Sequence, residues 1–144
     1  FGVIGVCCLL LVKYISLNSV PGTSMMVTLV LMPVVSRWAM VYAIFAYPYA
    51  RPSGLGKMLK QGASWWRLAI ATLITLVVAI VLTRLVGLVI MVGIWVIVIM
   101  VAAYLKHKFA GLTGDTYGAI NEVAEVGVLI FVSLLAHNQW LGLA

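Results

Sequence analysis

This chain of 144 residues has only 8% charged side chains against 65% hydrophobic ones, a mean hydropathy of +1.23 and a net charge of +6. A water-soluble domain keeps about a quarter of its residues charged, so the composition excludes a soluble domain and predicts an all-α integral membrane protein. The basic residues lie mostly between apolar segments, which indicates orientation in a membrane and argues against a nucleic-acid partner.

Five apolar segments follow one another along the chain. A helix that crosses a bilayer takes about 20 residues, and we expect about five such helices, over residues 1–17, 25–47, 66–83, 85–105 and 117–137. We assign residues 1–144 to a single polytopic membrane domain. The chain begins with Phe inside the first apolar segment, so we expect it to be a fragment of a longer protein.

The first segment contains one charged residue, Lys13, near its end. We expect this side chain to snorkel toward the outer interface, which keeps its charge hydrated. Cys7 and Cys8 are adjacent in an apolar run, and we expect them to be small buried hydrophobic residues.

The second segment carries Arg37 near its middle, four residues after Pro33, which should kink the helix. Counted along the helix axis, Arg37 lies about 15 Å from the end at Tyr47. This depth matches the one that we estimate for Glu125 in the fifth segment. We therefore expect Arg37 to face Glu122 or Glu125, or a bound phosphate, with a purely structural Arg–Glu pair as the alternative.

The next connection contains YPYARPSGLGK, residues 47–57. Its prolines end the helix, and Gly54 and Gly56 allow a tight turn that Arg51 and Lys57 flank. We interpret the two basic residues as a clamp for phosphate, although an ordinary basic loop at the membrane surface is the alternative. The spacing is not that of a P-loop.

The connections differ in charge, which predicts the topology. The loops at 48–66 and 106–116, with their flanks, hold six basic residues, namely Arg51, Lys57, Lys60, Arg67, Lys106 and Lys108. Loops rich in Lys and Arg tend to stay in the cytoplasm, so we place these two loops there and the short turns at 18–24 and 83–84 outside.

All the acidic residues of the chain, Asp115, Glu122 and Glu125, fall at the start of the fifth segment. Asp115 is a candidate helix N-cap, and at 100° per residue the carboxylates share one helix side with Asn121, with Gly118 leaving a gap between them. A charged acid near the bilayer centre costs about 2.5–3.5 kcal/mol. We therefore expect a polar pocket open to the cytoplasm, whose oxygens would suit Mg²⁺, with a structural ion pair as the alternative.

Three segments together resemble one family, cobalamin synthase. They are SRWAMVYAIFAYPYARPSGLGK, GLTGDTYGAINEVAEV and the opening FGVIGV, and they are similar to the C-terminal half of that enzyme. The resemblance implies an integral inner-membrane transferase of bacteria or archaea, with its active side facing the cytoplasm. It would join adenosylcobinamide-GDP to α-ribazole, or its 5′-phosphate, with release of GMP, as the last assembly step of vitamin B12, and it would require Mg²⁺.

The resemblance also implies site residues. The first two motifs are matched by Arg37, Arg51, Gly54, Gly56 and Lys57. The third motif is matched by Gly111, Thr113, Gly114, Asp115, Gly118, Asn121 and Glu122. Two departures are that Ala110 replaces a frequent glycine and that the N-terminal half of the family, with its Asp-rich motif, is absent from this chain.

These residues then take expected roles. Asp115 and Glu122 would bind Mg²⁺, Asn121 would orient an oxygen, and Arg37 would act with them. Arg51 and Lys57 would grip the diphosphate, and the glycines together with Thr113 would line the substrate. The expected partners are the two substrates, membrane lipid and the N-terminal half of the same protein, and a homo-oligomer is left open.

Three other functions fit the sequence less well. An ion-coupled transporter would also place Arg and Glu inside the membrane, but it would need a polar path to the outer face. Another nucleotide-activated phospho-alcohol transferase is the second alternative, although its D-x-x-D-G pattern does not occur here. A purely structural membrane subunit is the third.

Overall fold

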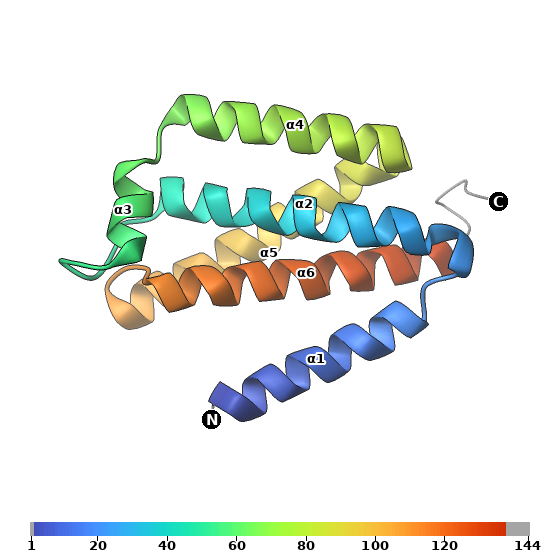
Figure 1. Ribbon diagram of the computed structural model, residues 1–144, viewed down its shortest axis with the longest axis horizontal. Coiled ribbons are helices and arrows are strands. Elements are labelled where there is room, and N and C mark those ends of the chain that lie inside the picture. Colours follow the sequence, from blue (N-terminus) through green and yellow to red (C-terminus); the bar gives the residue numbers. More distant parts are fainter. Residues whose placement is uncertain (1, 138–144) are drawn as a thin grey trace.

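The computed structural model describes residues 2–137, and all the regular elements in this range are α-helices (Figure 1). In chain order they are α1 (Gly2–Asn18), α2 (Gly22–Ala46), α3 (Leu55–Gln61), α4 (Trp65–Thr83), α5 (Leu85–Phe109) and α6 (Gly114–His137). Four of them, α2, α4, α5 and α6, are long and apolar enough to cross a membrane, and α1 is a shorter apolar helix. The prediction of an all-α membrane protein is therefore confirmed.

The core is formed by small and branched side chains that repeat every four residues on three helices. Such residues lie on one face of a helix, and these are fully buried: Leu31, Val35, Ala39 and Ala43 on α2, Ile90, Ile94, Val98 and Ala102 on α5, and Ile120, Ala124, Val128 and Val132 on α6. Because lipid is as apolar as these side chains, close packing rather than exclusion from water stabilises the contacts. The central pair of helices is α2 and α6 (Figure 1).

Helix α2 continues through Pro33 from Gly22 to Ala46. On its far side it packs against α4, where the indole Nε1–H of Trp38 donates to Thr72 Oγ1 at 2.8 Å. Helix α1 lies on the other side of the bundle, beside α6 (Figure 1). Most of its side chains are exposed, so the expectation that Cys7 and Cys8 are buried is wrong.

The short helix α3 was not expected from the sequence. It begins after Gly54, whose φ of +118° suits glycine, and it presents Leu55, Met58 and Leu59 as exposed apolar side chains. Lys60 fixes it to the end of α2 by donating to the carbonyl oxygens of Ile44 and Phe45 at 2.8 and 2.7 Å. Its ammonium group thus neutralises carbonyls that the helix end leaves unpaired.

The arrangement of the connections agrees with the predicted topology. The loop that contains α3 and the loop between α5 and α6 lie at one end of the bundle, while the α1–α2 turn and the α4–α5 corner lie at the other (Figure 1). The corner is Arg84, which has a φ of 54° and a backbone N–H bonded to Ile80 O. The two basic loops therefore lie at the same end of the bundle, as the distribution of Lys and Arg predicted.

Candidate functional site

Two glycine-containing loops that are far apart in the sequence are joined by backbone hydrogen bonds. Ala50 N–H donates to Leu112 O at 2.8 Å, and Leu112 N–H donates to Pro48 O at 2.9 Å. Tyr49 and Leu112 thereby form an isolated parallel β-bridge, and Leu112 is fully buried beneath it. The two loops predicted to act together are therefore one structural unit.

Packing of side chains also stabilises the two joined loops. The rings of Tyr49 and Tyr117 stack, and Tyr117 is only 2% exposed. A Cβ on Gly56 would collide with the ring of Tyr49, and a Cβ on Gly111 would come within 3.0 Å of Ala50. Gly54 and Gly56 are thus required by the packing of Tyr49 within its own loop, and Gly111 by the packing of the second loop on Ala50.

The start of α6 is capped by a threonine pair. Thr113 N–H donates to Thr116 Oγ1 at 2.6 Å, and Thr116 N–H donates back to Thr113 Oγ1 at 3.4 Å. This reciprocal pattern is a capping box. The expectation that Asp115 is the N-cap is therefore wrong: Thr113 caps the helix, and Asp115 lies in its first turn with an exposed carboxylate.

One side of α6 is open beside this carboxylate. A Cβ added to Gly114 or to Gly118 would have nothing within 4 Å, in contrast to the glycines of the loops. Asp115 lies between these two glycines in the sequence and is exposed as well. The first two turns of α6 therefore leave space for a group from outside the described residues.

Further along α6, the two glutamates share one cation, and that cation is Lys13 of α1. Lys13 Nζ donates to Glu122 Oε2 and to Glu125 Oε2, each at 2.6 Å. The Lys13 side chain is 19% exposed. The expectation that Lys13 snorkels to the outer interface is wrong, because acceptors inside the bundle hold its ammonium group.

The two glutamates differ in how fully they are bonded. Glu125 Oε1 accepts from Asn121 Nδ2 at 2.9 Å and from Ser36 Oγ at 3.5 Å, so both of its oxygens have partners. Glu122 Oε1 has no partner among the described residues, and the Glu122 side chain is 41% exposed against 14% for Glu125. Glu122 can therefore bind a further group, while Glu125 is saturated.

Asn121 is buried next to this cluster. Its Oδ1 atom has no hydrogen-bond partner among the described residues, and the residue is 6% exposed. A buried amide oxygen without a partner costs about 1–3 kcal/mol, so it is available to accept a hydrogen bond. The same holds for the hydroxyl group of Tyr117, one turn earlier on α6.

Arg37 does not join the carboxylates. It is exposed in a groove of about 420 Å³ between α2 and α4, which is lined by Pro33, Val34, Arg37, Trp38, Val41, Ala71, Ile74 and Thr75. Ser36, the preceding residue, is the one that faces Glu125. The ion pairs among the described residues are those of Lys13, so the predicted pairing of Arg37 with a glutamate is not formed.

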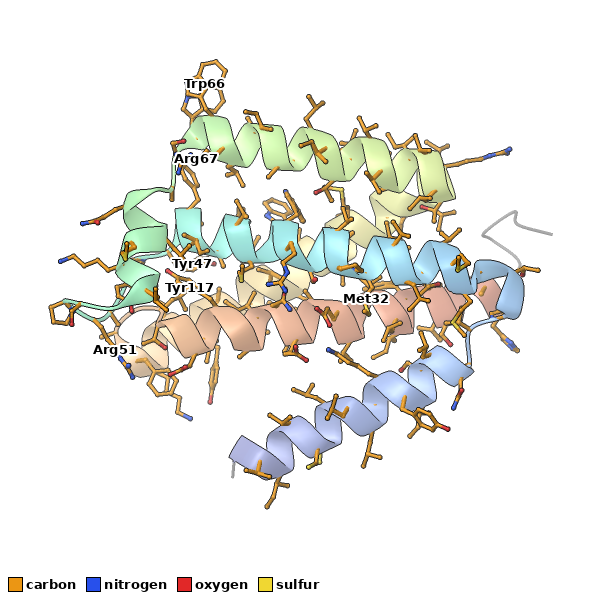
Figure 2. All side chains as sticks on the ribbon, viewed as in Figure 1. Met32, Tyr47, Arg51, Trp66, Arg67 and Tyr117 are labelled. Carbon is orange, nitrogen blue, oxygen red and sulfur yellow. The ribbon has the colours of Figure 1, made fainter. Side chains whose placement is uncertain are left out.

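The expected phosphate clamp lies at the joined loops. Arg51 follows the bridge between them and extends at the loop end of the bundle (Figure 2). Lys57 is exposed and donates to Pro52 O at 2.7 Å across its own turn. Both cations are at the same end of the molecule as Asp115, which is what a shared phosphate site requires.

A metal site is only partly supplied. No group of three His, Cys, Asp or Glu side chains comes together within residues 2–137. Asp115 and Glu122 lie two helical turns apart, about 10 Å along the axis, and each has free oxygen. Since Mg²⁺ takes six oxygen ligands and usually keeps several waters, these two carboxylates fit as part of a site that phosphate, water or another chain segment completes.

Sequence reasoning missed three contributors to this region: Lys13, Tyr49 and Tyr117. A signal for Lys13 did exist, because two of the three acidic residues lie inside an apolar segment and few basic residues lie deep enough to pair with them. The aromatic pair had no comparable signal, since its partners come from segments 68 residues apart in the sequence.

Comparison with known proteins agrees with these motifs. Residues 1–133 match the family model described as cobalamin-5-phosphate synthase. An adenosylcobinamide-GDP ribazoletransferase of Desulforamulus reducens is 37% identical over 134 residues, covering 92% of this chain and 53% of that protein. Proteins of the same name from a Roseiflexus species and from Synechococcus elongatus are each 36% identical, over 80% and 92% of this chain and 43% and 54% of their own length.

The chain therefore spans about half the length of the curated relatives that it matches. No solved structure matches it.

Proposed function

The chain belongs to the cobalamin-5-phosphate synthase family, and we propose that it is the part of an adenosylcobinamide-GDP ribazoletransferase that binds the activated diphosphate. The substrates would be adenosylcobinamide-GDP and α-ribazole or its 5′-phosphate. The remaining half of the enzyme would complete the site, as the length of the relatives suggests.

The observation that carries this proposal is the junction of the two motif loops. The backbone bonds between residues 48–50 and Leu112 bring Arg51 and Lys57 to the end of the bundle where the open side of α6 begins. Cations for a diphosphate and the Asp115 carboxylate thus lie at one end, with Glu122 about two helical turns further along α6. Phosphoryl transfer depends mainly on such positioning and charge compensation, with little covalent chemistry from the protein.

The carboxylates would hold Mg²⁺, which when bound neutralises charge that develops on the phosphoryl oxygens. Asp115 and the free Oε1 atom of Glu122 are the ligands from this chain. The oxygen atom of Asn121 is held in place because its amide nitrogen already donates to Glu125. This oxygen is buried and has no partner among the described residues, so Asn121 would accept a hydrogen bond from the substrate only once the site opens toward it.

In the reaction a hydroxyl oxygen of ribazole forms a bond to the phosphorus on the cobinamide side of the diphosphate. The hydroxyl proton is lost to water, the bond from this phosphorus to the oxygen of GMP breaks, and GMP leaves with the electron pair. Arg51 and Lys57 would bind the diphosphate oxygens throughout. Gly114 and Gly118 lack side chains where the substrate would approach α6.

We assign the active end to the cytoplasmic face of the inner membrane. Support comes from the basic residues, which gather at the end that holds the joined loops, while Arg84 is at the opposite corner. Charged phosphates do not cross lipid unaided, so a nucleotide-activated substrate made in the cytoplasm would meet the enzyme on that side.

The test is Asp115→Asn in the full-length enzyme. We expect Mg²⁺-dependent GMP release from adenosylcobinamide-GDP to fall at least about a hundredfold, since one carboxylate ligand is lost. Lys108→Gln is the matched control, because Lys108 lies at the same end and its ammonium group lies over the rings of Tyr104 and Phe109. Unchanged GMP release in Asp115→Asn would refute the metal role.

A further inference from the structure

The Lys13 ammonium group lies between two carboxylates of neighbouring helical turns. Its distances to Glu122 Oε2 and Glu125 Oε2 are both 2.6 Å. Residues three apart on a helix present their side chains to the same point, so Glu122 and Glu125 form a pair that one cation can bridge. In this structure the bridging cation belongs to the protein itself.

The surroundings fix this arrangement. Glu125 receives three hydrogen bonds, from Lys13, Asn121 and Ser36, on three different helices. Its position is therefore set independently of any bound ion. Lys13 reaches it from α1, which packs mainly against α6. Since a lysine is attached to the chain, this cation cannot dissociate.

We propose that Lys13 is a resident cation that takes the place of a divalent ion between Glu122 and Glu125. Without it, the two carboxylates would be an uncompensated pair of negative charges inside a membrane helix, which a divalent ion would bind strongly. With it, the pair is closed to metal.

This proposal rests on the proposed function for one consequence. Because Lys13 holds Oε2 of Glu122, Oε1 is the oxygen without a partner among the described residues, and it would be the one available to the Mg²⁺ that Asp115 is proposed to bind. Lys13 is thus a positioning residue that acts through Glu122. It sets both the direction of the free oxygen and the number of divalent ions that the site accepts.

The test counts bound Mn²⁺ on the full-length protein in detergent, by electron paramagnetic resonance. We expect Lys13→Met to bind one more Mn²⁺ per chain than the wild type. Lys13→Arg keeps a cation in place and should bind the wild-type number. Lys13→Met combined with Glu125→Gln should lose the additional ion. Lys106→Met, a matched change on the exposed last turn of α5, should change nothing.

A second measurement covers loss of stability, since removing one partner of an ion cluster inside a protein is destabilising. Mn²⁺ should raise the Tm of Lys13→Met by at least about 3 °C more than it raises that of the wild type. If Lys13→Met gains no Mn²⁺, or is not recovered folded even when Mn²⁺ is present, a divalent ion cannot replace the lysine and the proposal is overturned.

These counts are separate from the proposed function. If the wild-type protein releases no GMP, the transferase assignment fails. The number of Mn²⁺ ions bound by Lys13→Met and by the wild type still tests the role of Lys13 independently.

Discussion

The rings of Tyr49 and Tyr117 lie 6.3 Å apart between centroids, with an angle of 21° between their planes. Tyr49 belongs to the loop after α2 and Tyr117 to the first turns of α6, so this contact continues the β-bridge between the two loops as a side-chain contact. Stacked aromatic pairs contribute about 0.5–1.5 kcal/mol beyond their buried area. The stability of the candidate site therefore depends on whether these rings can stay in place.

Gly56→Ala should disrupt this contact. The added Cβ collides with the Tyr49 ring, and overpacking of this kind costs about 1–3 kcal/mol. Thermal unfolding in detergent measures the loss. Gly114→Ala is the control, because its Cβ would meet nothing within 4 Å. Equal Tm values for the two variants would show that the ring can move away freely.

Ala110→Gly should stabilise the protein. Ala110 ends α5 in the left-handed conformation, with φ 57° and ψ 19°, which costs a residue with a Cβ about 1 kcal/mol. The expected gain in the free energy of unfolding is up to about 1 kcal/mol, measured by denaturant titration. Ala103→Gly in the interior of the same helix should instead destabilise, and a gain in both variants would contradict the explanation.

Lys13 and Arg37 should differ in how they couple to Glu125. In double-mutant cycles of stability, Lys13→Met with Glu125→Gln should show a coupling energy of about 1–3 kcal/mol, because the side chains are in contact. Arg37→Met with Glu125→Gln should be additive within about 0.5 kcal/mol. A larger coupling for Arg37 would mean that it does reach the carboxylates.

Gly118→Leu should separate function from stability. The open space at Gly118 means that the larger side chain leaves the Tm within about 2 °C of the wild type. If the substrate approaches α6 here, as proposed, GMP release should fall at least about tenfold in the full-length enzyme. Full activity with a leucine at this position would place the substrate elsewhere.

Lys60 should make stability depend on alkaline pH. Burial lowers the pKa of Lys60 below its ordinary 10.5, so between the two values the unfolded chain binds more protons than the folded one. Stability should therefore rise with pH across that interval and stay flat with respect to this group at neutral pH. The measurement is Tm from about pH 8 to 10.5, where Lys60→Met should show a smaller slope than the wild type and than Lys57→Met. Equal slopes of Tm against pH in Lys60→Met and the wild type would show that Lys60 is not the group responsible.

The sequence predicted the helices well because lipid restricts the secondary structures that a chain can adopt. Every long apolar run has to satisfy its own backbone hydrogen bonds, which only a helix does within one segment. The largest shift among the spans is at the end of α5, which continues to Phe109 rather than to residue 105. Helix α3 escaped prediction because seven residues in a basic, glycine-containing loop give no periodic signal of their own.

The site was predicted in part. The two glutamates and Asn121 do lie together, because the helical repeat fixes their relative direction on α6, while Asp115 lies apart in its first turn. Arg37 failed for a different reason. Its depth was estimated from the helix rise, but rotation about the axis decides its neighbours, and one residue corresponds to about 100°. Ser36 therefore reaches Glu125 while Arg37 faces the groove beside α4.

The backbone bonds of Pro48 and Ala50 to Leu112 join the loop before the α4–α5 hairpin to the loop after it. Both ends of the hairpin are therefore anchored at the same place. The far corner of the hairpin at Arg84 is at the opposite end from this place. If the chain were cut at Arg84, each of the two fragments would keep one of the two joined loops. Arg84 is therefore the natural place to divide this polypeptide into two fragments that reassemble.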